Sequence, residues 1–175
     1  FTKAKANSKP IFFFQPGLES ITEMTLKFNG QKMHSDITVQ KQAGINGGNS
    51  GQSTLKNPFV PYVYRPRVLN QNSGDDNDTS EAAQNVLSSE IKNLVLTIKT
   101  SMWELDGKVI KPNQAISVRN PEIYLYKKSN WFIESVLLEG DEKQTTATLT
   151  CVVPEVYTGG TPDYVFEINE EKEHG

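Results

Sequence analysis

The side chains that could supply nucleophilic or zinc chemistry are two histidines, His34 and His174, and one cysteine, Cys151. A zinc site or a catalytic triad needs several such groups at one place. His34 lies in a predicted strand, His174 is the penultimate residue, and Cys151 alternates with apolar residues as a buried, unreactive thiol does. These unrelated settings predict no catalytic residue, no metal ligand and no cofactor site, so we expect a protein that is not an enzyme.

The glycine-rich segment "GINGGNSGQS" invites comparison with a phosphate-binding loop. Counting back from Gly51, Asn46 occupies the first glycine position and Gln52 the lysine position. No buried parallel strand precedes the segment and no helical pattern follows it directly, so the cradle for a phosphate has no scaffold. We therefore interpret residues 43–57 as a flexible loop.

Acidic residues suggest two further kinds of site. "DDND", which ends at Asp78, resembles half of a calcium loop, but Glu81 stands where an EF-hand counted from Asp76 needs glycine. Carboxylates at the start of a helix are favoured by the helix dipole, which explains the cluster without a metal. Other carboxylates are scattered over strands and turns, and nothing pairs them as a glycosidase requires.

Five aromatic residues leave two interpretations open. They could line one face that binds a sugar or a partner protein, or they could pack the interior of a β-barrel. The residues are Tyr62, Tyr64, Tyr124, Tyr126 and Trp131.

Length and charge narrow the class of protein. A chain of 175 residues fits one domain that can bury a sizeable core without a metal or a disulfide. The net charge of −3 and the lack of a long Lys/Arg run argue against specific binding of nucleic acid. No apolar run approaches the ~20 residues of a membrane-spanning helix. Because the chain begins with Phe1, we expect it to be part of a longer protein.

The first part of the chain predicts strands. Residues 11–14 form a short strand before a Pro-Gly turn, and residues 19–28 alternate so that Thr22, Met24, Leu26 and Phe28 form the buried face. Asn29-Gly30 is a strong hairpin signal, which predicts that residues 31–42 return antiparallel. Pro61 and Pro66 place the extended segment 59–70 at a sheet edge or outside regular pairing, and residues 70–78 form a second polar loop.

One helix is expected next. Asp78 is its predicted N-cap with Glu81 as the capping-box partner. Ala83, Leu87 and Ile91, followed by Leu94, lie at helical spacing and form the apolar stripe.

After the helix, the apolar residues recur at every second position, as in a β-strand. Leu94, Leu96, Ile98 and Met102 form one face of a strand, Asp106-Gly107 makes a turn, and residues 115–118 and 123–126 form two short strands. A final hairpin pairs a central strand, residues 131–138, with residues 145–153, whose inward side chains include Cys151. Residues 169–175 form an acidic tail. The fold class is mainly β, a β-barrel or sandwich of short antiparallel strands with one helical insertion.

The order of features from Arg65 to Tyr157 resembles the C-terminal part of the tail or baseplate hub proteins of Mu-like contractile-tailed phages. The matching features are "YRPRVL", a polar loop, a helix, a strand ending at Trp103, "DGKVIKPNQAISVRNPEI", "WFIESVLLEG", a Thr-rich strand and "PEVY". Their order carries the resemblance. It covers about the last two thirds of the chain, whereas the 43–57 loop and the acidic tail depart from the pattern.

The resemblance implies a structural role in the virion. Residues 1–175 would be a single β-barrel-type tube domain of a longer hub chain, which forms a homotrimer in the tail baseplate and is assembled in the host cytoplasm. The hub would join the tail tube protein to the central spike protein, contact the baseplate wedge proteins and line the DNA passage. A hub of a related bacterial injection device, either a tailocin or a secretion system, stays open, as does a carbohydrate- or receptor-binding β-module of the adhesin kind.

Overall fold

The computed structural model describes residues 6–43, 50–72 and 78–167, and they form a mainly β fold, as the sequence predicts. The strands and helices, with two 3-10 turns, are β1 (Phe12–Phe14), β2 (Ile21–Phe28), η1 (Gly30–Lys32), β3 (Asp36–Lys41), β4 (Gly51–Lys56), β5 (Pro66–Gln71), α1 (Thr79–Ile91), β6 (Leu94–Thr100), β7 (Glu104–Leu105), β8 (Lys108–Val109), β9 (Ala115–Asn120), η2 (Pro121–Ile123), β10 (Leu125–Gly140), β11 (Thr145–Val152) and α2 (Glu155–Thr158).

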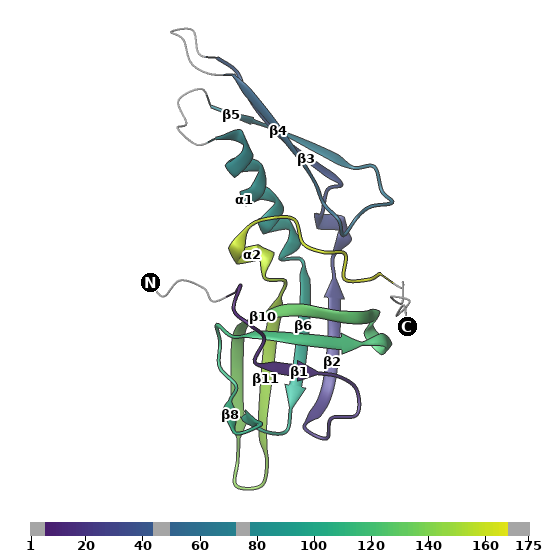
Figure 1. The fold of residues 1–175 in the computed structure, drawn as a ribbon, viewed down its shortest axis with the longest axis vertical. Coiled ribbons are helices and arrows are strands. Elements are labelled where there is room, and N and C mark those ends of the chain that lie inside the picture. The colour runs from purple at the N-terminus through teal and green to yellow at the C-terminus, as the bar shows by residue number, and fades with distance from the viewer. Residues whose placement is uncertain (1–5, 44–49, 73–77, 168–175) are drawn as a thin grey trace, which may run out of the picture.

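The main sheet has six strands in the order β1-β9-β10-β11-β6-β2. Its 16-residue strand β10 pairs with β9 through its first part and with β11 through its second part, and the register shifts between Ile133 and Ser135. A bulge of this kind bends a strand and increases its twist. The sheet therefore curls into a half-barrel, in which β9 and the first part of β10 run across β6 and β11 (Figure 1).

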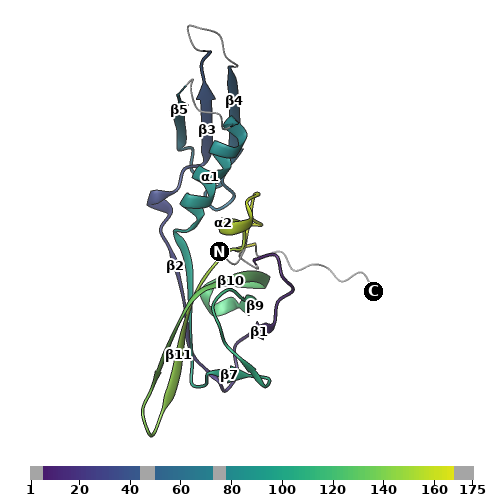
Figure 2. The same cartoon turned by 90° about the vertical axis from the view of Figure 1, so that its left-hand side faces the viewer.

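A second sheet of three strands, in the order β4-β3-β5, extends the molecule beyond the half-barrel, and α1 lies beside it (Figures 1 and 2). β3 pairs antiparallel with β4 and parallel with β5. β5 begins at Pro66 and is an edge strand, as its prolines predict.

The predicted hairpin at Asn29-Gly30 is wrong. β2 pairs with β6, and β3 belongs to the other sheet. Asn29 has a φ of −108°, whereas a type I′ turn needs positive φ at both central residues. Its N–H instead donates to the carbonyl of Asn93, 3.0 Å away, and the chain continues through η1 towards the second sheet. The predicted buried face of β2 is correct for Met24 and Leu26, which pack against the core, whereas Thr22 and Phe28 are exposed.

The expected loop over residues 43–57 is wrong in its second half, because Gly51–Lys56 forms β4. Polar side chains suit this strand, since it packs on one side only: the Oγ atom of Ser53 lies 2.9 Å from Oγ1 of Thr79 in α1. Residues 44–49 lie outside the described residues. The predicted polar loop 70–78 is wrong at its start, because β5 continues to Gln71. Its residues 73–77 and the whole predicted tail, residues 169–175, also lie outside the described residues.

The helix has the predicted start and buried face. The Asp78 side chain accepts a hydrogen bond from the Ser80 N–H at 3.3 Å, and Ala83, Leu87 and Ile91 are buried. Leu94 is also buried, but it begins β6. A second, four-residue helix, α2, follows Pro154. Among the described residues, none of the helices has the length and apolar character needed to cross a membrane.

The core lies on the concave side of the curled sheet. Leu96 and Ile98 of β6 share one face of the strand as predicted, and both are buried. Met102 does not belong to this face, because the strand ends at Thr100, whose Oγ1 donates to the Met102 carbonyl at 2.7 Å. The closing β10–β11 hairpin is confirmed. β10 lies between β9 and β11 in the sheet order, but it is not central beyond the bulge, because there, among the described residues, it pairs with β11 alone. The predicted strand 123–126 is wrong at its start: Ile123 ends η2 and Tyr124 has a φ of 66°, so the strand begins at Leu125.

Candidate assembly surfaces

The first candidate surface consists of the two lateral edges of the main sheet. In the described part of the chain, β2 pairs only with β6, and β10 beyond the bulge pairs only with β11. The set β10–β11–β6–β2 therefore has a free edge on each side. Free strand edges present unpaired backbone N–H and C=O groups, which natural proteins cover or use for association.

The convex face of these four strands is rich in hydroxyl groups. The registers align Thr25, Thr97, Thr150 and Ser135 in one row across the sheet. The opposite face carries the core, with Met24, Ile98, Leu149 and Val136 in the corresponding row.

The row next to the hydroxyl row contains an ion pair. Lys99 of β6 lies 2.8 Å from a carboxylate oxygen of Glu23 in β2. The hydrogen bond between Glu23 and Lys99 is the main reason that the pKa of Glu23 lies below its usual value. Since the lysine of this row is paired with a carboxylate, the row offers no uncompensated positive charge to a phosphate backbone.

The second candidate surface is an aromatic groove on the concave side of β2, with a volume of about 570 Å³. Phe166 stands at its centre, with ring centroids 5.7 Å from Phe28, 6.3 Å from Phe59 and 5.6 Å from Tyr164. Such edge-to-face clusters are rigid and apolar. The groove adjoins the free edge of β2, so an added strand could bury side chains in it.

The five aromatic residues singled out in the sequence do not form one face. Tyr62, Tyr64 and Tyr124 are exposed, Tyr126 is half-buried, and Trp131 is fully buried in the core. The packing interpretation is therefore confirmed for Trp131, whereas a binding role of the exposed tyrosines stays a hypothesis.

The cysteine and the histidines singled out in the sequence can be placed only in part. Cys151 is fully buried, and burial raises the pKa of its thiol far above the usual value. His174 lies outside the described residues. Within the described ranges, no group of three or more His, Cys, Asp and Glu side chains could hold a metal ion.

His34 belongs to a buried network that sequence reasoning missed. Glu90 of α1, with 5% of its side chain exposed, accepts from the His34 backbone N–H and lies against His34 Nδ1, both at 2.8 Å, and Arg67 of β5 donates to it at 3.0 Å. The signal was present in the sequence, because Glu90 falls on the apolar stripe of the helix, where a carboxylate needs partners.

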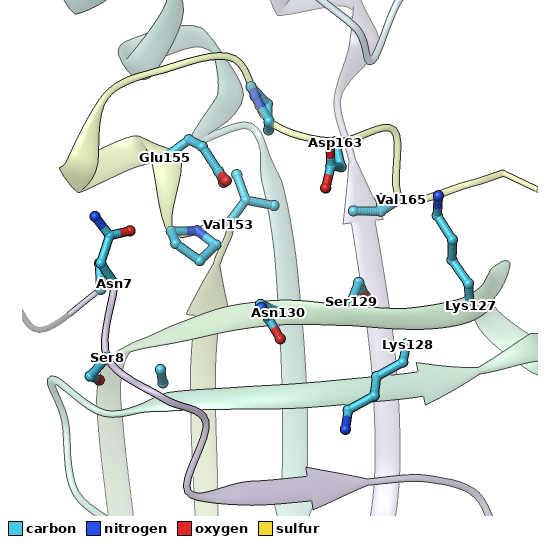
Figure 3. A pocket seen from close by; sticks show the side chains of 14 residues that line it. Asn7, Ser8, Lys127, Lys128, Ser129, Asn130, Val153, Glu155, Asp163 and Val165 are labelled. Atoms are coloured by element: carbon cyan, nitrogen blue, oxygen red, sulfur yellow. The ribbon is translucent and has the colours of Figure 1, made fainter.

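A polar cavity of about 240 Å³ lies where the N-terminal segment, β10 and the chain around α2 meet (Figure 3). Glu155 and Asp163 point towards it (Figure 3). Burial, and to a smaller extent the charge of Asp163, raises the pKa of Glu155. Lys127 forms an ion pair with Glu167, and Lys128 lies over the Phe13 ring. These lining groups do not make a nucleophile–base pair or a metal site.

Comparisons with known proteins give matches at the level of structure. No protein-family model matches the chain, and no curated protein matches it significantly in sequence. The 43 kDa tail protein of prophage MuSo2 from Shewanella oneidensis superposes with a TM-score of 0.64 at 18% identity, over 83% of this chain and 45% of that one. A tail protein from Neisseria meningitidis also gives a TM-score of 0.64, at 15% identity, over 87% of this chain and 47% of that one.

The chain therefore spans less than half the length of the two tail proteins it resembles. Identities this low establish a shared fold. The curled sheet with its added helix and three-stranded sheet is a fold found in tail proteins, one of them from a prophage.

Proposed function

We propose that this chain is a structural component of a phage tail, the hub of a contractile-tail baseplate, which joins the tail tube to the central spike and lines the DNA passage. The observation that carries the proposal is the curled four-stranded set β10–β11–β6–β2, free at both edges, in a fold shared with tail proteins. Its partners would be the tube protein, the spike protein and the baseplate wedge proteins, and its location the virion.

The two free edges are different strands, β2 on one side and the distal part of β10 on the other. When unlike surfaces of neighbouring subunits meet, the contact is heterologous and generates a closed ring if the rotation closes. In the proposed hub, three chains form the ring, and a second related barrel of the longer chain would alternate with the one described here. On the hydroxyl-rich convex face, the pairing of Lys99 with Glu23 weakens the attraction of that row for phosphate, which suits a DNA passage.

Solution mass tests the assembly. Size exclusion with light scattering on the protein should give a trimer.

Thr25→Cys combined with Ser135→Cys places one thiol on each edge strand, and oxidation should link neighbouring chains covalently. The control, Thr25→Cys with Thr150→Cys, moves the second thiol to the central strand β11 in the same row and should not cross-link. Because native Cys151 is buried, it will not confuse the result. A monomer that forms no cross-link contradicts the ring.

A carbohydrate- or receptor-binding β-module is the second candidate, and the exposed tyrosines Tyr62, Tyr64 and Tyr124 favour it. Binding to a glycan array that is lost in Tyr62→Ser/Tyr64→Ser would support that module over the hub.

A hub of a tailocin or secretion system would have the same ring. We propose that the chain has no catalytic activity; turnover of peptidoglycan would contradict this.

A further inference from the structure

The connection between β4 and β5 is pinned at both stems by one residue, Ser35. The Ser35 N–H donates to the Arg65 carbonyl at 2.9 Å, and Ser35 Oγ accepts from the Arg65 N–H at 2.9 Å. On the other stem, the Asn57 N–H donates to the Ser35 carbonyl at 2.8 Å. Three prolines, Pro58, Pro61 and Pro66, further restrict the backbone. Ser35 therefore holds the two ends of the loop together before any partner binds.

This pinned loop presents aromatic and basic groups to solvent. Tyr62 is 90% exposed and Tyr64 87% exposed, and Lys56 and Arg65 are exposed beside them. Tyr and Arg on a rigid support are the residues that dominate binding energy in protein interfaces. An isolated loop gains nothing from exposing two aromatic rings, so the arrangement points to a partner.

An open hollow of about 540 Å³ lies within the loop. Its lining combines apolar Val60 and Pro61 with Lys56, Asp36 and the buried Asn57. Asp36 accepts from Ser35 Oγ at 2.7 Å. The Nδ2 group of Asn57 has no hydrogen-bond partner within the described part of the chain. A partner that offers an aliphatic side chain and a carboxylate would fill the hollow and pair with Lys56.

The β10–β11 turn offers the complementary chemistry. Leu137 and Leu138, 57% and 45% exposed, stand just before the acidic residues Glu139 and Glu142. Asp141 Oδ1 accepts from the backbone N–H groups of Lys143 and Gln144, at 2.8 and 2.9 Å, which stabilises the turn. The carboxylates of Glu139, Asp141 and Glu142 outnumber the exposed Lys143, so the turn is acidic overall. Figure 1 shows this turn at the lower end of the molecule and the β4–β5 connection in the upper half, so the two cannot meet within one chain.

We propose that the Tyr62–Arg65 loop is a docking surface for the acidic, leucine-bearing β10–β11 turn of a second copy of this chain. A leucine enters the hollow, the carboxylates of Glu139 and Glu142 face Lys56 and Arg65, and the tyrosines cover the contact. The contact goes beyond the proposed ring, because one of its two surfaces is the β4–β5 loop, which belongs to neither free strand edge.

Charge-reversed pairs test the contact. Sedimentation velocity on the native protein should show concentration-dependent association that high salt weakens. Lys56→Glu/Arg65→Glu makes the loop acidic, and Glu139→Lys/Glu142→Lys makes the turn basic. Each variant alone should associate at least about tenfold more weakly, because like charges then face each other. An equimolar mixture should associate again, since each loop meets a turn of opposite charge.

A matched control carries the same charge change at Glu19 and Glu81, exposed carboxylates outside both surfaces, and should associate like the native protein. Tyr62→Ser/Tyr64→Ser should weaken association without changing its dependence on salt. A native protein that shows no salt-sensitive association, or a mixture that fails to restore it, overturns the proposal. The cysteine pair on the edge strands tests the ring independently of this contact. If the charge-reversed variants still cross-link but the mixture does not restore association, the ring stands and the docking contact is wrong.

Discussion

Glu90 and His34 are joined twice: Oε2 of Glu90 accepts from the His34 backbone N–H, and Oε1 lies against Nδ1, both at 2.8 Å. Arg67 completes the set from β5. One buried carboxylate thus connects α1 to the segment entering β3 and to β5, which holds the three-stranded sheet against the helix.

Replacing Glu90 with alanine should lower the free energy of unfolding by about 3 kcal/mol, because His34 and Arg67 lose their shared, buried acceptor. Arg67→Ala should cost about 1 kcal/mol or less, since its side chain is 42% exposed. Urea denaturation measures both. If Glu90→Ala costs no more than Arg67→Ala, the carboxylate does not hold these elements together.

Leu87 is fully buried on the inner face of α1, so Leu87→Asp places an unpaired charge in the core. We expect a loss of about 4 kcal/mol in the free energy of unfolding. Asn85→Asp, on the exposed face of the same helix, is the matched control and should change stability by less than about 0.5 kcal/mol. An equal melting temperature for the two variants would show that the helix faces the other way.

Tyr157 donates a hydrogen bond to Glu134. Burial, followed by this hydrogen bond, raises the pKa of Tyr157 from 10.0 to about 12. The unfolded chain releases the proton near pH 10, whereas the folded chain keeps it until about pH 12. The stabilising contribution is therefore complete below pH 10 and is lost as the pH rises through about 12.

Melting curves of the native protein and Tyr157→Phe against pH check this. The native protein should lose melting temperature more steeply than the variant across that window, and tyrosinate absorbance should show one late-titrating tyrosine. Parallel pH profiles of the two proteins would be evidence against the shift.

Cys151 should react with a thiol reagent only after unfolding, because it is buried and its raised pKa suppresses the thiolate. Leu137→Cys, on the neighbouring strand but exposed, should react at once in the same protein. Rapid loss of both thiols in the folded state would show that the β10–β11 pair opens readily.

The sequence by itself determined the elements whose signals are local. The helix start at Asp78 depends on a side chain two residues from the N–H it caps. The stripe through Leu87 and the alternation of Leu94, Leu96 and Ile98 follow from the periods of a helix and a strand. The turn at Asp106-Gly107, where both residues have positive φ, is equally local.

Only the tertiary structure decided which strands pair and which polar residues meet. β2 pairs with β6, although Asn29-Gly30 favoured a hairpin with the next segment of the chain. Pairing with β6 places Met24 and Leu26 against the core. The Glu90 network joins residues 56 positions apart, and the docking loop depends on Ser35 reaching Arg65. Local patterns fix the period and the caps of each element, whereas pairing is decided by the area that distant segments bury together, which no short window of sequence contains.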